Sequence, residues 1–485
     1  MSRNLSLMKR FRLIGLLAFI TAALSSLRAN PTTALVNGTL IDPGTARTVP
    51  NAVIIIEGDH ISAVGDEAGA ISTKGARIID CKGKFILPGY IDTHVHFFQS
   101  GDIYTRPDAV DLTKIRSYKD EIAWVKKNLP DTLARYLRCG ITSVVDVGGP
   151  MWNFEARKIA NSIAKAPRVA AAGPLISSVS RPQLDLGDPP IVKIDTPEQG
   201  RELVRKLAAQ KPDYIKIWYI VNDENPVEKF RPVVHAVIEE SHARKLRVAV
   251  HATELEAARA SVEEGADLLV HSVNDKLVDE AFVKLMKDRG AILTPTLVVF
   301  ERYGRAFANK LNFTPEEKAW GNPEVLASLD VTKIPSDKVP DRIKTAIANP
   351  DAVLDRIQKT YDVALKNLKT VQDAGVIIAA GTDAGNIGTI HGPALFREFQ
   401  LMKEAGLTPM QILQCATANA ARVFDTTGGA SFRSSPAPKI GTIAPGNLAD
   451  LVILKSNPAE DIAHASDIDS VMKNGILFPA SGFSR

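Results

Sequence analysis

The chain contains 485 residues, of which 45% are hydrophobic and 24% are charged, which is enough for a large buried core in two or three domains or in one barrel with an appendage. The formal net charge of +4 does not indicate a nucleic-acid partner, because residues 1–29 carry five basic and no acidic side chains and the rest of the chain is nearly neutral. The three cysteines are too widely spaced for a disulfide framework or a zinc knuckle.

Residues 1–29 have the pattern of a secretory signal peptide. Lys9, Arg10 and Arg12 precede an apolar run that extends from Leu13 to about Leu24 and is followed by small residues. The run is shorter than the roughly 20 residues that span a bilayer. We therefore expect a cleaved leader, no permanent membrane span, and a secreted or periplasmic protein. An uncleaved N-terminal anchor is the alternative.

Both ends of the remaining chain are rich in short strand patterns. Residues 34–38 and 52–58 have this character, and residues 449–454 and 471–475 return to it. We predict one small β-sandwich domain built from residues 30–87 together with residues 436–485.

The segment between them, residues 88–435, alternates between β-branched runs and amphipathic stretches of helical length. The expected strands are 90–95, 141–146, 168–172, 214–218, 247–251, 267–271, 291–295 and 376–381, and the expected helices include 197–210, 227–245, 254–264, 277–289, 351–374 and 391–406. Eight strand–helix units predict the α/β class and a (β/α)8 TIM barrel. An open doubly wound sheet is the alternative, and the lack of a Gly-rich nucleotide loop after the first strand disfavours it.

Two long interruptions follow predicted strands, at residues 97–127 and at about 300–350. Loops after the strands of a barrel open onto its catalytic face. We therefore expect both interruptions to shape or cover a pocket.

The first predicted strand ends in a pair of histidines, His94 and His96. Residues i and i+2 of a strand point to the same face, so the two imidazoles project together. Imidazole is the commonest side-chain ligand for zinc-like ions. The pair alone is weak support for a metal site, because two nearby histidines often have other roles.

Further residues with side chains that can bind a metal ion lie at the ends of other predicted strands. Four of the nine histidines of the chain occupy such positions, and catalytic groups of parallel barrels come from the ends of different strands. Together these residues predict a metal centre: His94, His96, Lys216, His251, His271 and Asp383.

This constellation resembles the metal-dependent amidohydrolase superfamily, in particular its imidazolonepropionase-like and Xaa-Pro dipeptidase-like branch. The motifs that carry the resemblance are His94-Val95-His96, Lys216, His251, His271 and Gly381-Thr382-Asp383. The resemblance covers nearly all of the chain after the leader, including the segments Leu87-Pro88-Gly89 and 446–451. It implies that residues 88–435 form a metal-dependent hydrolase domain.

The resemblance also implies two divalent ions, with zinc expected. In such enzymes the lysine is carboxylated to an anionic carbamate, whereas a free lysine is cationic near neutral pH and repels a metal. By resemblance, His94, His96 and Asp383 bind one ion, His251 and His271 bind the other, and carboxylated Lys216 bridges them. If Lys216 is an ordinary surface or salt-bridged lysine, a mononuclear site remains open.

The implied activity is hydrolysis of an amide C–N bond by metal-activated hydroxide, with Asp383 as the catalytic residue that moves the proton to the leaving nitrogen. The expected partner is a small-molecule substrate, either an Xaa-Pro-like dipeptide or an N-acyl amino acid. A cyclic amide or lactone hydrolase is one alternative, and a non-catalytic binding protein on the same fold is another. A homo-oligomer is left open.

Three further residues are candidates for substrate contacts. Tyr219 is a candidate hydrogen-bond donor to the developing oxyanion, Arg181 a candidate partner for a substrate carboxylate, and His391 a candidate near the eighth strand. Each has a plain alternative, which is core packing for Tyr219, a solvated loop arginine for Arg181, and a helix-start residue for His391.

Overall fold

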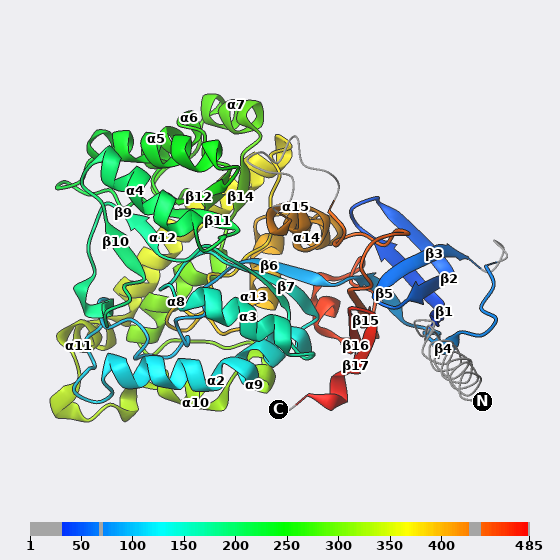
Figure 1. Ribbon diagram of the computed structural model, residues 1–485. Helices are drawn as coiled ribbons and strands as arrows, with labels where there is room; N and C mark the ends of the chain where they lie inside the picture. Colours follow the sequence, from blue (N-terminus) through cyan, green and yellow to red (C-terminus); the bar gives the residue numbers. More distant parts are fainter. Residues whose placement is uncertain (1–31, 67–70, 426–437, 484–485) are drawn as a thin grey trace, which may run out of the picture.

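The computed structural model describes residues 32–66, 71–425 and 438–483, so the predicted leader and the expected boundary at residue 436 lie outside the described residues. A larger lobe of strands and helices is joined to a smaller lobe of strands (Figure 1). Within the described residues, no helix is sufficiently long and apolar to cross a membrane.

The smaller lobe is one eight-stranded sheet made from both ends of the chain. Its order is β17-β16-β15-β5-β1-β2-β3, with β4 paired to β1. The antiparallel pair β5–β15, in which Leu87 faces Val452, joins the two ends. The strands are β1 (Thr32–Asp42), β2 (Arg47–Glu57), β3 (His60–Asp66), β4 (Arg77–Asp80), β5 (Phe85–Pro88), β15 (Leu451–Leu454), β16 (Ile468–Lys473) and β17 (Ile476–Pro479).

The described strands of the predicted β-rich domain form a single hydrogen-bonded sheet. One buried cluster takes residues from strands at both ends of the sheet order, such as Ile61 of β3 and Met472 of β16. The sheet therefore curls around a shared core, which gives this lobe an interior without a second sheet.

The larger lobe contains parallel strands in two hydrogen-bonded groups, with orders β10-β9-β11-β12-β13-β14 and β6-β7-β8. Every pairing within these groups is parallel. The strands are β6 (Tyr90–Val95), β7 (Ile141–Asp146), β8 (Arg168–Ala171), β9 (Leu175–Ser177), β10 (Ile191–Lys193), β11 (Tyr214–Trp218), β12 (Arg247–His251), β13 (Leu268–Val270) and β14 (Ile292–Thr294).

The eighth expected strand, at 376–381, is an extended segment rather than a regular strand. Its backbone is nevertheless hydrogen-bonded to both groups, because Leu293 of β14 donates to Ile377 and Thr93 of β6 donates to Ala380. The third expected strand, 168–172, is found as β8, which pairs with β7. The short strand β9 follows it and pairs with β11.

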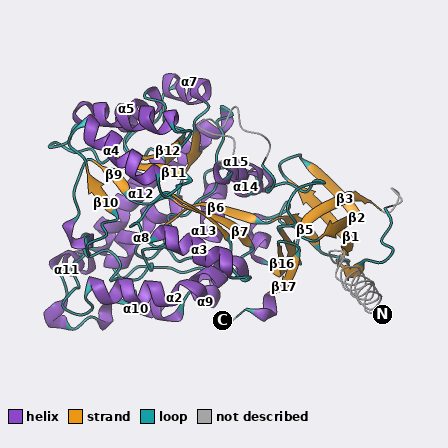
Figure 2. Ribbon diagram, viewed as in Figure 1, coloured by secondary structure: helices purple, strands orange, loops and turns teal. Residues whose placement is uncertain are grey.

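Helices enclose the parallel strands (Figure 2). Their ends follow the usual capping chemistry: Asp279 accepts a hydrogen bond from the backbone at the start of α7, and Gly290 ends that helix in the left-handed conformation. The helices that alternate with strands are α2 (Tyr118–Arg138), α3 (Asn153–Ser162), α4 (Pro197–Ala208), α5 (Val227–Ala243), α6 (Leu255–Glu263), α7 (Glu280–Arg289), α12 (Pro350–Asp373), α13 (Ala394–Glu404), α14 (Pro409–Ala416) and α15 (Ala418–Phe424).

The two expected interruptions pack against each other. Ile103 and Val110 from the first share a buried cluster with Phe307 and Val325 from the second. The second interruption is mostly helical and contains α8 (Leu297–Phe307), α9 (Pro315–Trp320), α10 (Pro323–Ser328) and α11 (Asp341–Ala348), with short 3₁₀ turns η3 (Val331–Lys333) and η4 (Ser336–Lys338). Further 3₁₀ turns are η2 (Pro182–Leu184), η5 (Ile462–Ser466) and η6 (Ala480–Gly482).

Candidate metal centre

The six predicted metal ligands converge on one cavity at the carboxyl ends of the parallel strands. The cavity has a volume of about 320 Å³. Because each side chain follows a different strand end, or shares an end at i and i+2, the backbone alone brings them together. The members of the set that line this cavity are His94, His96, Lys216, His251, His271 and Asp383.

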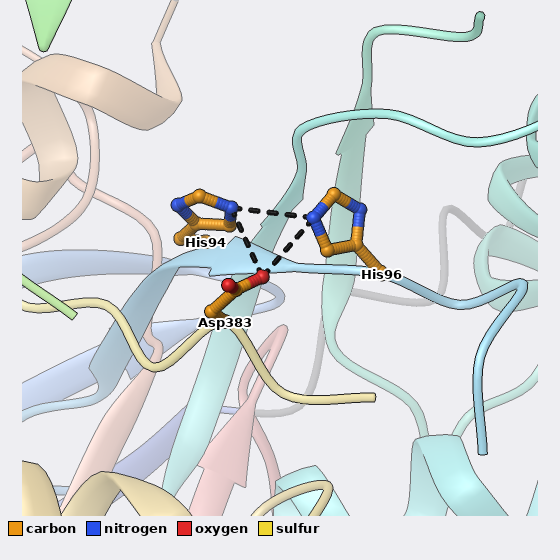
Figure 3. Close-up of side chains that lie close together, drawn as sticks. All are labelled: His94, His96 and Asp383. Carbon is orange, nitrogen blue, oxygen red and sulfur yellow. Dashed lines mark hydrogen bonds and ion pairs between the residues drawn. The ribbon is translucent and has the colours of Figure 1, made fainter. Parts of the chain in front are cut away.

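Three of the six form a tight cluster, in which His94 and His96 project from β6 toward Asp383 (Figure 3). The ligand atoms of these residues lie within 4.8 Å of one another. The Nε2 atoms of the two histidines are 3.3 Å apart. Asp383 Oδ1 is 3.3 Å from His94 Nε2 and 3.1 Å from His96 Nε2.

A second pair of histidines adjoins this cluster. The ring centroids of His251 and His271 are 4.4 Å apart, and the His271 ring is 5.0 Å from the His94 ring. The Lys216 side chain is fully buried in the same cavity wall. The arrangement thus contains a three-ligand group, a two-ligand group and one lysine.

Hydrogen bonds on the far sides of two imidazoles orient them. His96 Nδ1 donates to the Gly148 carbonyl oxygen at 2.6 Å, and since a carbonyl only accepts, Nδ1 carries a proton. His96 Nε2 faces Asp383. His271 Nδ1 is 2.6 Å from Thr296 Oγ1, so a hydroxyl orients this ring in the same manner.

The backbone at two of these positions is unusual. His271 has φ 81° and Asp383 has φ 61°, in the left-handed region that non-glycine residues seldom adopt. Buried Asp92 holds the segment around Asp383 in place. Its carboxylate accepts hydrogen bonds from His94 N at 3.2 Å and from Thr382 Oγ1 at 2.7 Å. Asp92 thereby connects β6 to the segment that carries Asp383.

Burial sets the charge state of the ligands. It lowers the pKa of His94 to about 3 and lowers the pKa values of His251 and His271 well below the ordinary range, so all three rings are neutral near pH 7. Burial also lowers the pKa of Lys216 to about 7. Burial alone would raise the pKa of Asp383, but His94 and His96 outweigh it and hold that pKa well below its usual value.

Several buried polar atoms of the cavity have no hydrogen-bond partner. Among the described residues these include Lys216 Nζ, His94 Nδ1 and Asp383 Oδ1. Leaving a buried polar atom unpaired costs about 1–3 kcal/mol. In addition, His96 Nε2 and Asp383 Oδ1 face each other at 3.1 Å. A divalent cation could bind both atoms, so the donor set fits a metal ion.

The cavity lining also contains residues that the sequence did not single out. Arg106 Nη1 donates to Asn386 Oδ1 at 3.0 Å, and Tyr303 Oη donates to the same oxygen at 2.5 Å. Both Arg106 and Tyr303 line the cavity, with the apolar side chains of Phe98, Leu175, Trp218 and Phe300. Arg106 lies in the first interruption and Tyr303 in the second, which was the one signal that could have drawn attention to them.

None of the three candidates for substrate contact is among the residues that line the cavity. Tyr219 is buried away from the cavity, donates its hydroxyl hydrogen bond to the Val227 carbonyl and packs on Phe230 at 5.4 Å between ring centroids. Trp218 lines the cavity instead. On β11 the side chains alternate, so Lys216 and Trp218 share the inner face while the neighbouring tyrosine leaves it.

Arg181 and His391 also lie outside the cavity lining. The Arg181 guanidinium stacks over Trp218 at 5.1 Å, and its Nε is 3.4 Å from Asp108 Oδ2. His391 is structural: its Nε2 donates to the Gln99 carbonyl at 2.8 Å, and its Nδ1 accepts from Tyr136 Oη at 2.7 Å.

Cavity volume alone would not have identified the candidate site. A cavity of about 460 Å³ lies beside α8 and α13, where Glu301, Arg305, Lys318 and Arg397 line it. None of the six predicted ligands borders this cavity. The convergence of metal-binding side chains, and not volume, therefore identifies the candidate site.

Comparison with known proteins agrees with this geometry. A sequence model of the amidohydrolase family matches residues 85–477. The ochratoxinase of Aspergillus niger is 26% identical over 480 residues, which cover 91% of this chain and 86% of the fungal protein. The family match includes all six candidate metal ligands.

Solved structures show the same overall fold. A Xaa-Pro dipeptidase with methionine bound in its active site superposes with a TM-score of 0.68 and 24% identity, over 92% of this chain and 100% of that one. The structure of Aspergillus niger ochratoxinase superposes with a TM-score of 0.67 and 22% identity, over 93% of this chain and 96% of that one.

Proposed function

The chain belongs to the amidohydrolase family, and from that membership we propose that it is a binuclear metallohydrolase that cleaves an amide C–N bond in a small molecule. The observation that carries the proposal is the convergence of four histidines, Lys216 and Asp383 on one buried cavity. A protein that only binds ligands on this fold would have no need of the complete set.

We propose that the two groups of parallel strands form one closed (β/α)8 barrel. Two features support closure: residues 376–384 are hydrogen-bonded to both β14 and β6, and β8 and β9 follow each other along one side to pair with β7 and β11. The convergence of side chains from different strand ends is typical of the catalytic face of such a barrel.

The residues present divide naturally between two ions. His94, His96 and Asp383 would hold one, and His251 and His271 would hold the other. Neutral imidazoles and an ionised carboxylate are good zinc ligands, so we expect zinc.

Carboxylation of Lys216 would complete both sites. Its amine is buried without a hydrogen-bond partner, and burial lowers its pKa to about 7, which leaves much of it as the neutral amine that reacts with carbon dioxide. That reaction forms a C–N bond, releases a proton and replaces a potential positive charge with an anion. An anion here would bridge the two groups of ligands, whereas an ammonium would repel any cation they hold.

Ions bound here would supply Lewis acidity, lowering the pKa of water and polarising a substrate carbonyl. Asp383 remains ionised because its neighbours hold its pKa low, so its carboxylate can accept the proton that water gives up. The same carboxyl group can then deliver the proton to the leaving nitrogen, since an amide departs poorly as an anion. The cavity volume of about 320 Å³ admits a small molecule and not a folded protein.

We propose that the substrate is an N-acyl amino acid or a dipeptide. Support comes from the ochratoxinase likeness over most of both chains and from the fold shared with a Xaa-Pro dipeptidase.

A substrate screen tests this function. The zinc-loaded protein is incubated with N-acyl amino acids, Xaa-Pro dipeptides, cyclic amides and lactones, and products are quantified by mass spectrometry. We expect turnover of at least one linear amide. Turnover of lactones or cyclic amides alone would reassign the bond that is cleaved, and no turnover by protein carrying two ions would contradict a hydrolytic role.

A further inference from the structure

We propose that the part of the cavity lined by Arg106 selects substrates that carry a carboxylate, which Arg106 binds with the assistance of Arg181. This inference rests on the proposed amide hydrolysis and names the feature that its substrates share. The inference is supported by two guanidinium groups, those of Arg106 and Arg181, which lie beside one buried carboxylate, that of Asp108, at the rim of the cavity.

Arg106 is held rigidly at this wall. Its Nε and Nη2 donate to the two oxygens of Asp108, each at 2.7 Å, and its Nη1 donates to Asn386 Oδ1 at 3.0 Å. One hydrogen on Nη2 has no partner in these contacts. A guanidinium that is fixed in orientation loses little freedom when it binds a planar carboxylate, which favours recognition.

The charges around Arg106 do not cancel. Asp108 neutralises one guanidinium, yet Arg181 Nε also approaches Asp108 Oδ2 at 3.4 Å, so two cations share one anion. Arg181 is partly exposed and lies flat against Trp218, which itself lines the cavity. This part of the rim therefore has a surplus of one positive charge.

No other cation of the lining can take this role. Among the described residues that line the cavity, the only Lys or Arg side chains are Arg106 and Lys216. Lys216 lies among the metal ligands, where the proposed carbamate makes it an anion. Arg106 is therefore the one Lys or Arg side chain of the described lining that lies outside the group of candidate metal ligands.

The position of Arg106 also suits a substrate whose amide lies at the metal ligands. Asn386, which accepts from Arg106, donates through Nδ2 to the carbonyl oxygen of Asp383 at 3.2 Å. The Asn386 side chain thus connects the guanidinium to the backbone of the catalytic aspartate. We infer that a substrate whose amide lies at the metal ligands, and whose carboxylate is a few bonds from the scissile nitrogen as in an amino acid, places that carboxylate near Arg106. Phe98, Trp218 and Phe300 favour an aromatic side chain.

The test compares N-acetyl-L-phenylalanine with its C-terminal carboxamide, which differ only in charge. Acetate release by the zinc-loaded protein is followed for both compounds. We expect kcat/KM to favour the carboxylate at least tenfold, and Arg106→Gln to abolish that preference mainly through KM. Arg305→Gln, in the separate cavity beside α8, is the matched control and should keep the preference.

Two further variants separate recognition from structural support. Asp108→Asn should increase the preference for the carboxylate, because it removes the anion that offsets Arg106, whereas a purely structural salt bridge predicts no change in preference. Arg181→Gln alters a partly exposed side chain and should reduce the preference by a smaller factor. Arg181→Gln also keeps the test decisive if Arg106→Gln does not fold.

Calorimetric titration with L-phenylalanine and L-phenylalaninamide provides a readout independent of turnover. A carboxylate preference that disappears in Arg106→Gln supports the inference even if neither acetyl compound is hydrolysed, a result that would count against the proposed function alone. Equal acetate release from both compounds, unchanged by Arg106→Gln and accompanied by equal binding of both ligands, would overturn the inference and leave amide hydrolysis intact.

Discussion

The proposed two-ion arrangement depends on one residue, Lys216, whose amine is buried. It lies among neutral imidazoles with no hydrogen-bond partner, and burial lowers its pKa to about 7. Each of these observations fits an amine that becomes a carbamate, whose new oxygens would then face the two proposed ions.

Lys216→Ala should therefore lose bound metal, because the bridging anion is removed. Short-chain carboxylates such as acetate or propionate should restore part of the metal content by occupying the vacated space. Metal per chain is measured by mass spectrometry after dialysis. Lys473→Ala, which removes another buried lysine from the distant strand β16, is the control and should retain its metal. Unchanged metal content in Lys216→Ala would rule out the bridge.

Asp383→Asn tests the proton-transfer role. The amide keeps the size of the side chain but cannot accept a proton, and general acid–base groups contribute about 10²–10⁴-fold to rate. We expect kcat to fall by a factor in that range on whichever amide is turned over, with the thermal unfolding transition retained. The exposed Asp341→Asn at the start of α11 serves as the comparison. A kcat close to that of the wild type would remove Asp383 from this role.

The residues that the sequence indicated and those that it did not differ in a physical way. His and Asp residues at strand ends stand out by type and position, so the convergence of His94 and Asp383 on one cavity was predictable. Arg106 was not recognisable, because its role depends on how two interruptions fold together. Tyr219 was misjudged because strand alternation continues past β11, which places Trp218 on the inner face.

At the scale of elements, helix α8 connects the metal centre to the core. Thr296, which orients His271, precedes α8 and has a left-handed backbone, so its side chain does not cap the helix. Glu398 of α13 replaces the missing cap: its two carboxylate oxygens accept from Leu297 N at 2.9 Å and from Val298 N at 2.8 Å. A carboxylate at a helix start is favoured both by these hydrogen bonds and by the helix dipole.

Glu398→Gln should loosen that connection. Glutamine provides one acceptor oxygen in place of two and turns an amide donor toward a backbone N–H. We expect a loss of about 1–3 kcal/mol in the free energy of unfolding, and weaker binding of the ion assigned to His251 and His271. Denaturant titration and stepwise metal chelation measure the two effects. Asp279→Asn, a comparable change at the cap of α7, should affect stability without altering chelation.

Elements were predictable where their periodicity is strong. Helices such as α4, α5, α12 and α13 begin and end within a few residues of their expected limits. The eighth strand is less regular than expected because the chain must turn at Asp383, whose φ is 61°. The third strand ends within a residue of its expected limit, and Gly173, at φ 78°, a conformation that glycine tolerates, separates it from β9.

At the scale of the whole molecule, the two interruptions form a second small core over one side of the cavity. Ile103, Val110 and Leu112 from the first contact the buried residues of α8, α10 and α11. Arg106 lies within this first segment and Tyr303 on α8, and both line the cavity. The packing of this core therefore sets the position of the cavity wall that these two residues form.

Ile103→Ala should weaken this core and displace that wall. Truncation of a fully buried isoleucine costs about 2–5 kcal/mol, and Ile103 is completely inaccessible. We expect a lower unfolding temperature and a rise in KM that exceeds any fall in kcat, because the metal ligands lie on other elements. Ile476→Ala, at an exposed position of β17, is the control and should change neither quantity. A change in kcat alone would place the effect at the metal ligands.

The division of the chain into lobes was only partly readable from sequence. Strand-rich composition at both ends indicated that they associate, and the β5–β15 pair joins them. Alternating patterns do not reveal whether strands belong to one sheet or to two, so the single curled sheet was not foreseeable. The signal peptide, export and oligomeric state stay predictions.

Metal content measured together with the carbamate tests the central claim most directly. The zinc-loaded protein is crystallised, anomalous diffraction is recorded at the zinc edge, and electron density is inspected at Lys216. We expect two zinc ions, one at His94, His96 and Asp383 and one at His251 and His271, with a carboxylated lysine between them. A single ion beside an unmodified lysine, or no ion at micromolar zinc, would contradict it.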